Sequence, residues 1–147
     1  MPEHTELLQL AQALKRAYAA ALRPVEQTHG LTRNEVDVLL FLANNPGCDT
    51  ARDMVELRGL TKSHVCRSVE HLAGLGFLEA RRDGRDRRVV RLKLLPAADA
   101  AVDAARAAQQ AFFHRLWRGV APEEDAVLER VLGRLSANLK EGMSSCC

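Results

Sequence analysis

The sequence predicts a mainly α-helical (α+β) domain in which four helices precede one β-hairpin and two helices follow it. Three observations lead to this prediction. Apolar residues recur at three- and four-residue steps through most of the chain, as on one face of an amphipathic helix. Gly and Pro residues interrupt that pattern at intervals. An Asp-Gly turn at Asp83 and Gly84 lies between two segments that have strand character.

Length and composition restrict the class of protein. The 147 residues, 47% hydrophobic and 27% charged, suffice for one core and argue against intrinsic disorder. No apolar run approaches the roughly 18 residues that a membrane span needs, and residues 1–6 are acidic and lack the pattern of an export signal. We therefore expect a soluble, cytoplasmic protein with no membrane partner. Aromatic residues make up only 4%, which disfavours stacking on single-stranded nucleic acid.

The first predicted helix covers residues 5–29, where apolar side chains recur at helical spacing. Pro24 should kink this helix or divide it, because proline cannot donate the backbone hydrogen bond of a helix interior. Gly30 should end it.

The second helix should begin after Thr32, whose side chain can cap it, with Glu35 completing a capping box. The Asn44–Gly47 segment should end this helix. A short third helix is expected from Ala51 to about Arg58. Three of its side chains should turn inward: Met54, Val55 and Leu57.

Thr61 should cap a longer fourth helix that runs to about Leu75. One face of this helix is apolar, with Val65, Val69 and Leu72 at helical spacing. The opposite face is polar and consists of Ser63, His64, Arg67, Glu70 and His71. Such a helix can dock on its neighbours and leave its polar face for a ligand.

Residues 77–82 and 87–94 should pair as two strands around a turn at Asp83–Asp86. The segment Arg81–Arg91 holds six Arg and two Asp residues, and six guanidinium groups would repel one another unless anions lay beside them. Residues 52–93 contain 11 Lys or Arg and 6 Asp or Glu, a net charge of +5, whereas the rest of the chain has 10 and 13, a net charge of −3. This asymmetry predicts one face that binds a polyanion.

Pro96 should open an Ala-rich fifth helix that runs to about Val120. Its inward stripe is predicted to be Ala98, Ala101, Val102, Ala105, Ala108, Phe112, Leu116 and Val120. Pro122 and the three acidic residues after it should start the sixth helix. The inward residues of that helix are predicted to be Val127, Leu128, Val131, Leu132, Leu135 and Leu139.

Together, the third helix, the Gly turn, the fourth helix and the basic hairpin form the pattern of a winged helix-turn-helix, in which the hairpin is the wing. The major groove of DNA admits one α-helix, and its base edges differ in their donors and acceptors. Double-stranded DNA is therefore the expected partner. Predicted contacts lie near the N-terminus of the fourth helix (Lys62, Ser63, His64 and Arg67) and near the wing tip (Arg85, Arg87 and Arg88). Asp83 and Asp86 should orient the wing, because phosphate would repel their carboxylates.

Six stretches carry a more specific signal: Arg23-Pro24, His29–Thr32, Thr50–Val55, Lys62–Arg67, His71–Leu78 and Arg81–Arg88. In these stretches the sequence resembles the MarR family of bacterial transcription regulators. The Asp-Arg-Arg motif at 86–88 is the most specific element. Two departures stand out: Cys66 occupies a position where the family usually has Thr, and Leu95–Asp99 differs from the usual Leu-Thr-Glu-x-Gly.

The resemblance implies a homodimer formed by the first and last helices and a pseudo-palindromic operator. One MarR-like domain would cover residues 1–147, with the winged helix-turn-helix at 31–95 and the helical dimerisation part at 1–30 and 96–147. The expected function is that of a ligand-responsive repressor, not an enzyme, with no cofactor and no metal. Phe112, Phe113 and Trp117 are expected in the dimer core and are the candidates for lining the pocket of a small-molecule effector.

Two alternatives stay open at this point. The first is a thiol-based redox-sensing regulator of the same fold, with Cys66, Cys146 and Cys147 as candidate sensors. For Cys66 we favour the simpler interpretation, that it is a small side chain packed in the protein. The second is a winged-helix protein-interaction module whose basic hairpin meets an acidic partner. An enzyme is disfavoured, because the sequence has no Gly-rich phosphate loop, no nucleophile elbow and no His-x-x-x-His pair.

Overall fold

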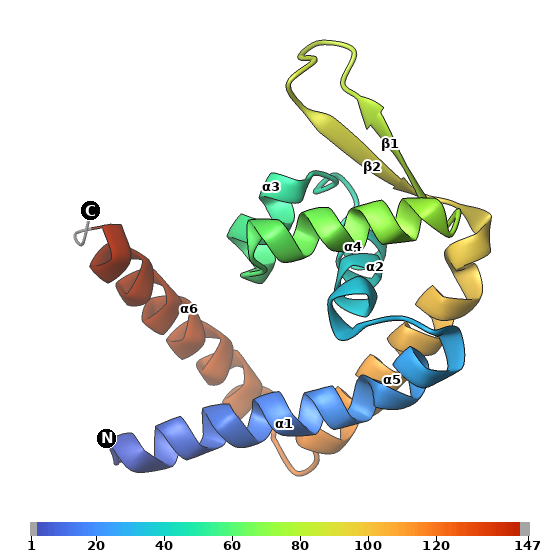
Figure 1. The fold of residues 1–147 in the computed structure, drawn as a ribbon. Helices are drawn as coiled ribbons and strands as arrows, with labels where there is room; N and C mark the ends of the chain where they lie inside the picture. The colour runs from blue at the N-terminus through green and yellow to red at the C-terminus, as the bar shows by residue number, and fades with distance from the viewer. Residues whose placement is uncertain (1–2, 145–147) are drawn as a thin grey trace. The chain divides into compact units, whose positions relative to one another are not determined.

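The computed structural model describes residues 3–144, which form helices and one two-stranded antiparallel sheet (Figure 1). The chain divides into two compact units, Met1–Phe112 and Phe113–Cys147. The predicted fold class is confirmed: four helices, a hairpin and two helices follow one another in that order. No helix among the described residues combines the length and the hydropathy that a bilayer crossing requires.

The first unit contains most of the secondary structure. Its elements are α1 (His4–His29), α2 (Arg33–Asn44), α3 (Ala51–Asp53), α4 (Lys62–Gly74), β1 (Leu78–Arg82), β2 (Val90–Leu94) and most of α5 (Asp99–Leu116). A π-helical turn, η1 (Met54–Arg58), continues α3, and a short 3₁₀ turn, η2 (Pro96–Ala98), leads into α5. The second unit holds the end of α5 and α6 (Pro122–Ser144).

Helix α1 continues through Pro24, so of the two expected effects of this proline, a kink or a division, the division does not occur. Proline removes only one backbone hydrogen bond, and burial of Leu22 and Val25 on either side of it keeps the helix in place. The helix ends at Gly30, as predicted. Gly30 adopts the left-handed conformation with φ 64° and donates its N–H to the Glu26 carbonyl.

The threonine caps lie where the sequence predicts them, but one capping box does not form. Thr32 Oγ1 accepts the Glu35 N–H at 3.2 Å. The Glu35 carboxylate, however, binds His71 rather than the Thr32 backbone, so the predicted box is wrong. A reciprocal box forms instead at the start of α3, where Thr50 and Asp53 each accept the other's backbone N–H at 3.1 Å.

Leu57 was expected to turn inward but is 63% exposed. The reason is that the short helix widens into the π turn η1 after Asp53. A π turn holds more residues than an α-helical turn, so the side chains after its start rotate away from the predicted face. Met54 remains fully buried and Val55 is half-buried, as expected.

The core of the first unit lies where α2 packs against α1, α4 and β2. Val65 and Leu72 of α4 are fully buried and Val69 is half-buried, so the predicted apolar face of this helix is confirmed. Leu78 of β1 and Leu92 of β2 join the same core. This packing fixes one face of α4 and leaves its opposite face to solvent.

We expect Leu72→Ala to lower the free energy of unfolding by about 3 kcal/mol, because it removes apolar contacts and leaves a cavity in the core. Leu57→Ala is the matched control, and it should change this free energy by less than about 0.5 kcal/mol because Leu57 is exposed. Chemical denaturation followed by circular dichroism measures both values. Equal losses in the two variants would contradict the assignment of the inward face of α4.

The last two helices depart from the prediction in their apolar stripes. The stripe of α5 is confirmed as far as Phe112, but α5 ends at Leu116, and both Leu116 and Val120 are exposed. On α6, all six residues predicted to face inward are exposed, with exposed fractions from 38% to 69%. The physical reason is that no described element of the second unit packs over that side of α6.

Candidate nucleic-acid interface

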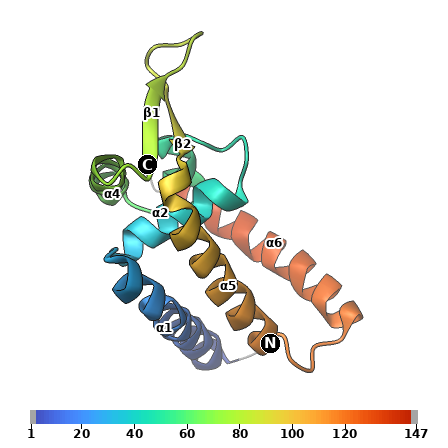
Figure 2. The ribbon, with the colours of Figure 1, turned by 90° about the vertical axis from the view of Figure 1, so that its right-hand side faces the viewer.

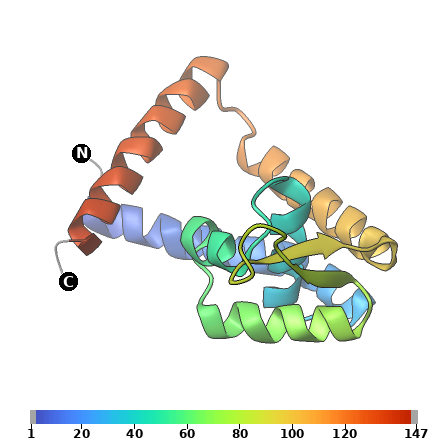
Figure 3. The same cartoon turned by 90° about the horizontal axis from the view of Figure 1, so that it is seen from above.

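Helix α4 presents a polar face to solvent along one edge of the first unit (Figure 3). Lys62, Ser63, His64 and Arg67 are all exposed on it. Thr61 caps the helix by accepting the His64 N–H at 3.3 Å. Since the first turn of α4 contains no acidic residue, its free backbone amides and its positive dipole end favour an anion such as phosphate.

Sequence reasoning missed the burial of Ser68 on the same helix. Cys66 was expected to be packed, and this is wrong: its side chain is exposed. It follows Val65 by one position, which rotates it off the buried face. Cys48 is half-buried, whereas Cys146 and Cys147 lie outside the described residues.

The hairpin projects from the helices of the first unit (Figures 1 and 2). Its strands pair with Leu78 opposite Leu94 and Arg82 opposite Val90. Residues 83–89 form the turn, so the expectation that the second strand begins at Arg87 is wrong.

The turn is long because two carboxylates bind its backbone. Asp83 Oδ2 accepts the Asp86 N–H at 3.1 Å, and Asp86 Oδ1 accepts the Arg88 N–H at 3.0 Å. The Asp83 N–H in turn donates to the Val89 carbonyl at 2.8 Å. These bonds hold residues 83–89 in a closed loop. They use backbone groups that would otherwise be free to extend the pairing of the two strands.

The arginines of the hairpin fall into two groups. Arg81 pairs with Glu79 at 2.9 Å, and Arg91 pairs with Asp49 at 2.7 Å and with Asp83 at 3.6 Å. Within the part of the chain that the structure describes, no ion pair is recorded for Arg82, Arg85, Arg87 or Arg88. These four side chains are exposed, so the positive charge near the wing tip is left for an external anion.

Asp49 holds the base of the wing, and sequence reasoning did not single it out. Its carbonyl accepts the Leu92 N–H at 2.8 Å, while its carboxylate accepts a hydrogen bond from Arg91. That hydrogen bond, together with the negative charge of Asp49, raises the pKa of Arg91 above its ordinary value. Because Asp49 and Arg91 are 42 residues apart, no local pattern in the sequence could indicate the pair.

The three aromatic residues proposed for an effector pocket divide between the two units. In the first unit, Phe112 is buried and its ring centroid lies 5.3 Å from that of Tyr18. In the second unit, Phe113 and Trp117 meet edge to face at 5.8 Å, and Trp117 Nε1 donates to Asp125 Oδ1 at 2.8 Å. Their part in binding an effector stays a prediction.

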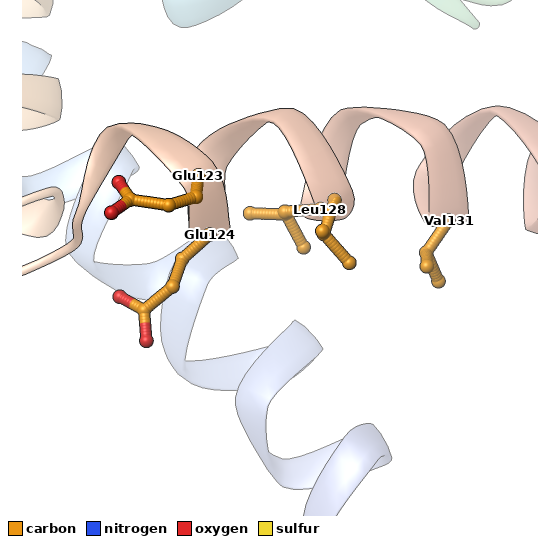
Figure 4. A pocket seen from close by; sticks show the side chains of 5 residues that line it. Glu123, Glu124, Leu128 and Val131 are labelled. Carbon is orange, nitrogen blue, oxygen red and sulfur yellow. The ribbon is translucent and has the colours of Figure 1, made fainter.

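A shallow hollow of about 450 Å³ lies on α6 and is lined by Glu123, Glu124, Val127, Leu128 and Val131 (Figure 4). Leu128 and Val131 point from the same side of the helix, as their spacing requires. The second unit therefore presents an apolar surface with acidic residues at one end.

No group of three His, Cys, Asp or Glu side chains in the described residues could hold a metal ion.

Comparison with known proteins confirms the resemblance seen in the sequence. The model of the family described as MarR family matches residues 29–89, from the end of α1 to the end of the wing turn. A MarR-family transcriptional regulator from Silicibacter pomeroyi superimposes with a TM-score of 0.77 and 23% identity, over 88% of this chain and 86% of that one. No curated protein sequence matches the chain.

Two further solved structures are similar. The transcriptional regulator PA3341 has a TM-score of 0.79 and 26% identity, over 93% of this chain and 97% of that one. BpsR of Bordetella bronchiseptica, whose DNA binding is regulated by 6-hydroxynicotinic acid, has a TM-score of 0.61 and 25% identity, over 87% of this chain and 98% of that one. The fold of MarR-family transcription regulators thus extends over nearly the whole chain.

Proposed function

We propose that this chain, whose residues 29–89 match the model of the MarR family, is a ligand-responsive repressor that binds a pseudo-palindromic operator as a homodimer. The observation that carries this proposal is the group of exposed arginines on the wing that form no ion pair within residues 3–144. Arg85, Arg87 and Arg88 lie on a turn that is closed by carboxylates bound to its own backbone. The same unit presents the polar, cationic face of α4. The first unit thus offers a helix for the major groove and arginine side chains for the minor groove.

In this proposal α4 enters the major groove. Lys62, Ser63, His64 and Arg67 lie near its N-terminus, which is the end that contacts base edges in helix-turn-helix proteins. Arg67 can donate two hydrogen bonds to a guanine, whereas Lys62 and the first amides of α4 suit phosphate. The wing arginines would contact the adjacent minor groove or its phosphates, where arginine is favoured electrostatically.

The exposed apolar side chains of α1 and α6 support the homodimer. On α1 these are Leu7, Leu8, Leu10 and Leu14, and on α6 they are Val127, Leu128, Val131, Leu132, Leu135 and Leu139. Apolar stripes of this size on a helix surface are typical of an interface with another protein. A second copy of the chain would remove both stripes from water, and two copies would place two α4 helices on one duplex.

Ligand response is the finer part of the proposal. The similarity to BpsR, whose DNA binding is regulated by 6-hydroxynicotinic acid, supports a small-molecule effector for this chain as well. An effector that prefers a different spacing of the two α4 helices would weaken operator binding by the ratio of its affinities for the two states.

Selection of bound duplexes from a random pool by the purified protein tests the proposed function. We expect enrichment of a palindrome whose half-sites lie about one helical turn apart. Retention of DNA without any enriched sequence would overturn the regulator and favour the protein-interaction alternative.

A further inference from the structure

Helix α2 carries two carboxylates that are almost completely buried. Glu35 is 4% exposed and Asp37 is 6% exposed. A buried carboxylate destabilises a fold unless it is paired and hydrogen-bonded. Each of the two is paired with a residue next to or within α4, so α4 is attached to α2 by polar bonds as well as by apolar packing.

Glu35 holds the C-terminal end of α4. Its Oε2 accepts a hydrogen bond from His71 Nδ1 at 2.8 Å. Glu35 is in the first turn of α2 and His71 is in the last turn of α4. The His71 side chain is 54% exposed, so it is held in place mainly by this bond and not by packing.

Asp37 holds the segment that leads into α4. Its Oδ1 accepts hydrogen bonds from Arg58 Nη2 at 3.4 Å and from Arg33 Nε at 3.1 Å. Arg58 ends the π turn η1, just before the Gly59 turn and the Thr61 cap. The Arg33 guanidinium lies over the ring of Tyr18 in α1, 4.7 Å from its centroid, and thereby connects the same cluster to α1.

We infer that Glu35 and Asp37 are positioning residues that hold α4 at both ends and set its orientation on DNA. The apolar contacts of Val65 and Leu72 resist separation of α4 from the core but allow it to rotate or slide slightly. Hydrogen bonds at both ends are directional and oppose those movements. This inference rests on the proposed function, because it assigns the two residues to sequence reading by α4.

The inference makes a selective prediction. Base-edge hydrogen bonds require precise placement of side chains, whereas phosphate contacts made by flexible arginines tolerate small shifts. Loss of the Glu35–His71 bond or of the Asp37–Arg58 bond should therefore weaken binding to the operator and leave binding to unrelated duplexes unchanged. A purely structural role would lower the stability of the fold without this selectivity.

His71→Ala is the first test, and because it leaves the buried Glu35 carboxylate without this partner, its free energy of unfolding is measured before affinities are compared. We expect about tenfold weaker binding to the duplex selected by the wild type, the effect of losing one charge-assisted hydrogen bond. Binding to a random-sequence duplex should stay within about twofold. His71→Asn should restore most of the loss, because its amide nitrogen can occupy the position of Nδ1. Fluorescence anisotropy measures all of these affinities.

Asp37→Asn tests the other end and should show the same selective loss, because it neutralises the partner of Arg58. Glu56→Gln is the matched control: Glu56 pairs with Arg52 at 2.9 Å, but both side chains are exposed and neither contacts α2 through this pair. That variant should bind both duplexes as the wild type does. The free energy of unfolding is measured for every variant so that affinities are compared between folded proteins.

Full retention of operator affinity by His71→Ala and Asp37→Asn would overturn the inference. Equal losses on the two duplexes, or no recovery in His71→Asn, would also overturn it. Failure of the proposed function gives a different result, because the wild type itself would then show no preference for any duplex.

Discussion

Replacing Arg87 and Arg88 by Ala is expected to weaken operator binding about 100-fold or more at physiological salt. Both side chains lie on the wing turn, are exposed, and have no recorded ion pair among the described residues. No intramolecular ion pair of the described residues therefore has to break when these two side chains bind phosphate or enter a groove. Since each dimer would carry two wings, the double variant removes four cations from the complex.

The salt dependence of binding distinguishes this explanation from a general loss of structure. Each lost phosphate contact should reduce the slope of log K against log salt by about 0.9. Lys15→Ala with Arg23→Ala removes the same charge from α1, outside the basic segment, and should leave the slope nearly unchanged. Affinity and slope that match the wild type in the Arg87 and Arg88 variant would count against the wing as a DNA-binding element.

A charge on the apolar stripe of α6 should convert the protein to monomers and abolish tight operator binding. Leu135 lies near the middle of that stripe and is exposed in the single chain. In a dimer interface, Leu135→Arg would bury an unpaired cation, which is strongly unfavourable. Operator affinity should then fall by about 100-fold or more, because a monomer contacts one half-site only and loses the high effective concentration that a linked second subunit provides.

Ala137→Arg is the matched control for this change, because residue 137 is exposed on the opposite side of α6. Sedimentation equilibrium measures the mass of each variant, and anisotropy measures its affinity for the operator. We expect a monomer for Leu135→Arg and a dimer for Ala137→Arg. A Leu135→Arg protein that remains dimeric and binds normally would exclude this face of α6 from the interface.

Local sequence signals predicted most of the secondary structure. Thr32, Thr50 and Thr61 cap helices where their side chains can accept a backbone N–H three residues later. Gly30 ends α1 because a left-handed residue is needed there. The apolar and polar faces of α4 also follow directly from helical spacing. Each of these features depends on residues within one or two turns of each other.

Features that depend on distant residues could not be predicted in the same way. Glu35 has the right spacing for a capping box, but a histidine 36 residues later binds its carboxylate. The pairing of Asp49 with Arg91 likewise joins residues that are 42 positions apart in the sequence. For α6 the sequence indicates an apolar face correctly, but periodicity cannot tell whether the same chain or another one covers it.

The spacing of two half-sites tests most directly whether two α4 helices bind one duplex together. Affinity is measured for the selected palindrome and for versions whose centre is lengthened by about 5 and about 10 base pairs. We expect the first insertion to abolish tight binding, because it turns one half-site to the far side of the duplex. Equal affinity for all three duplexes would contradict a paired reading of DNA by this protein.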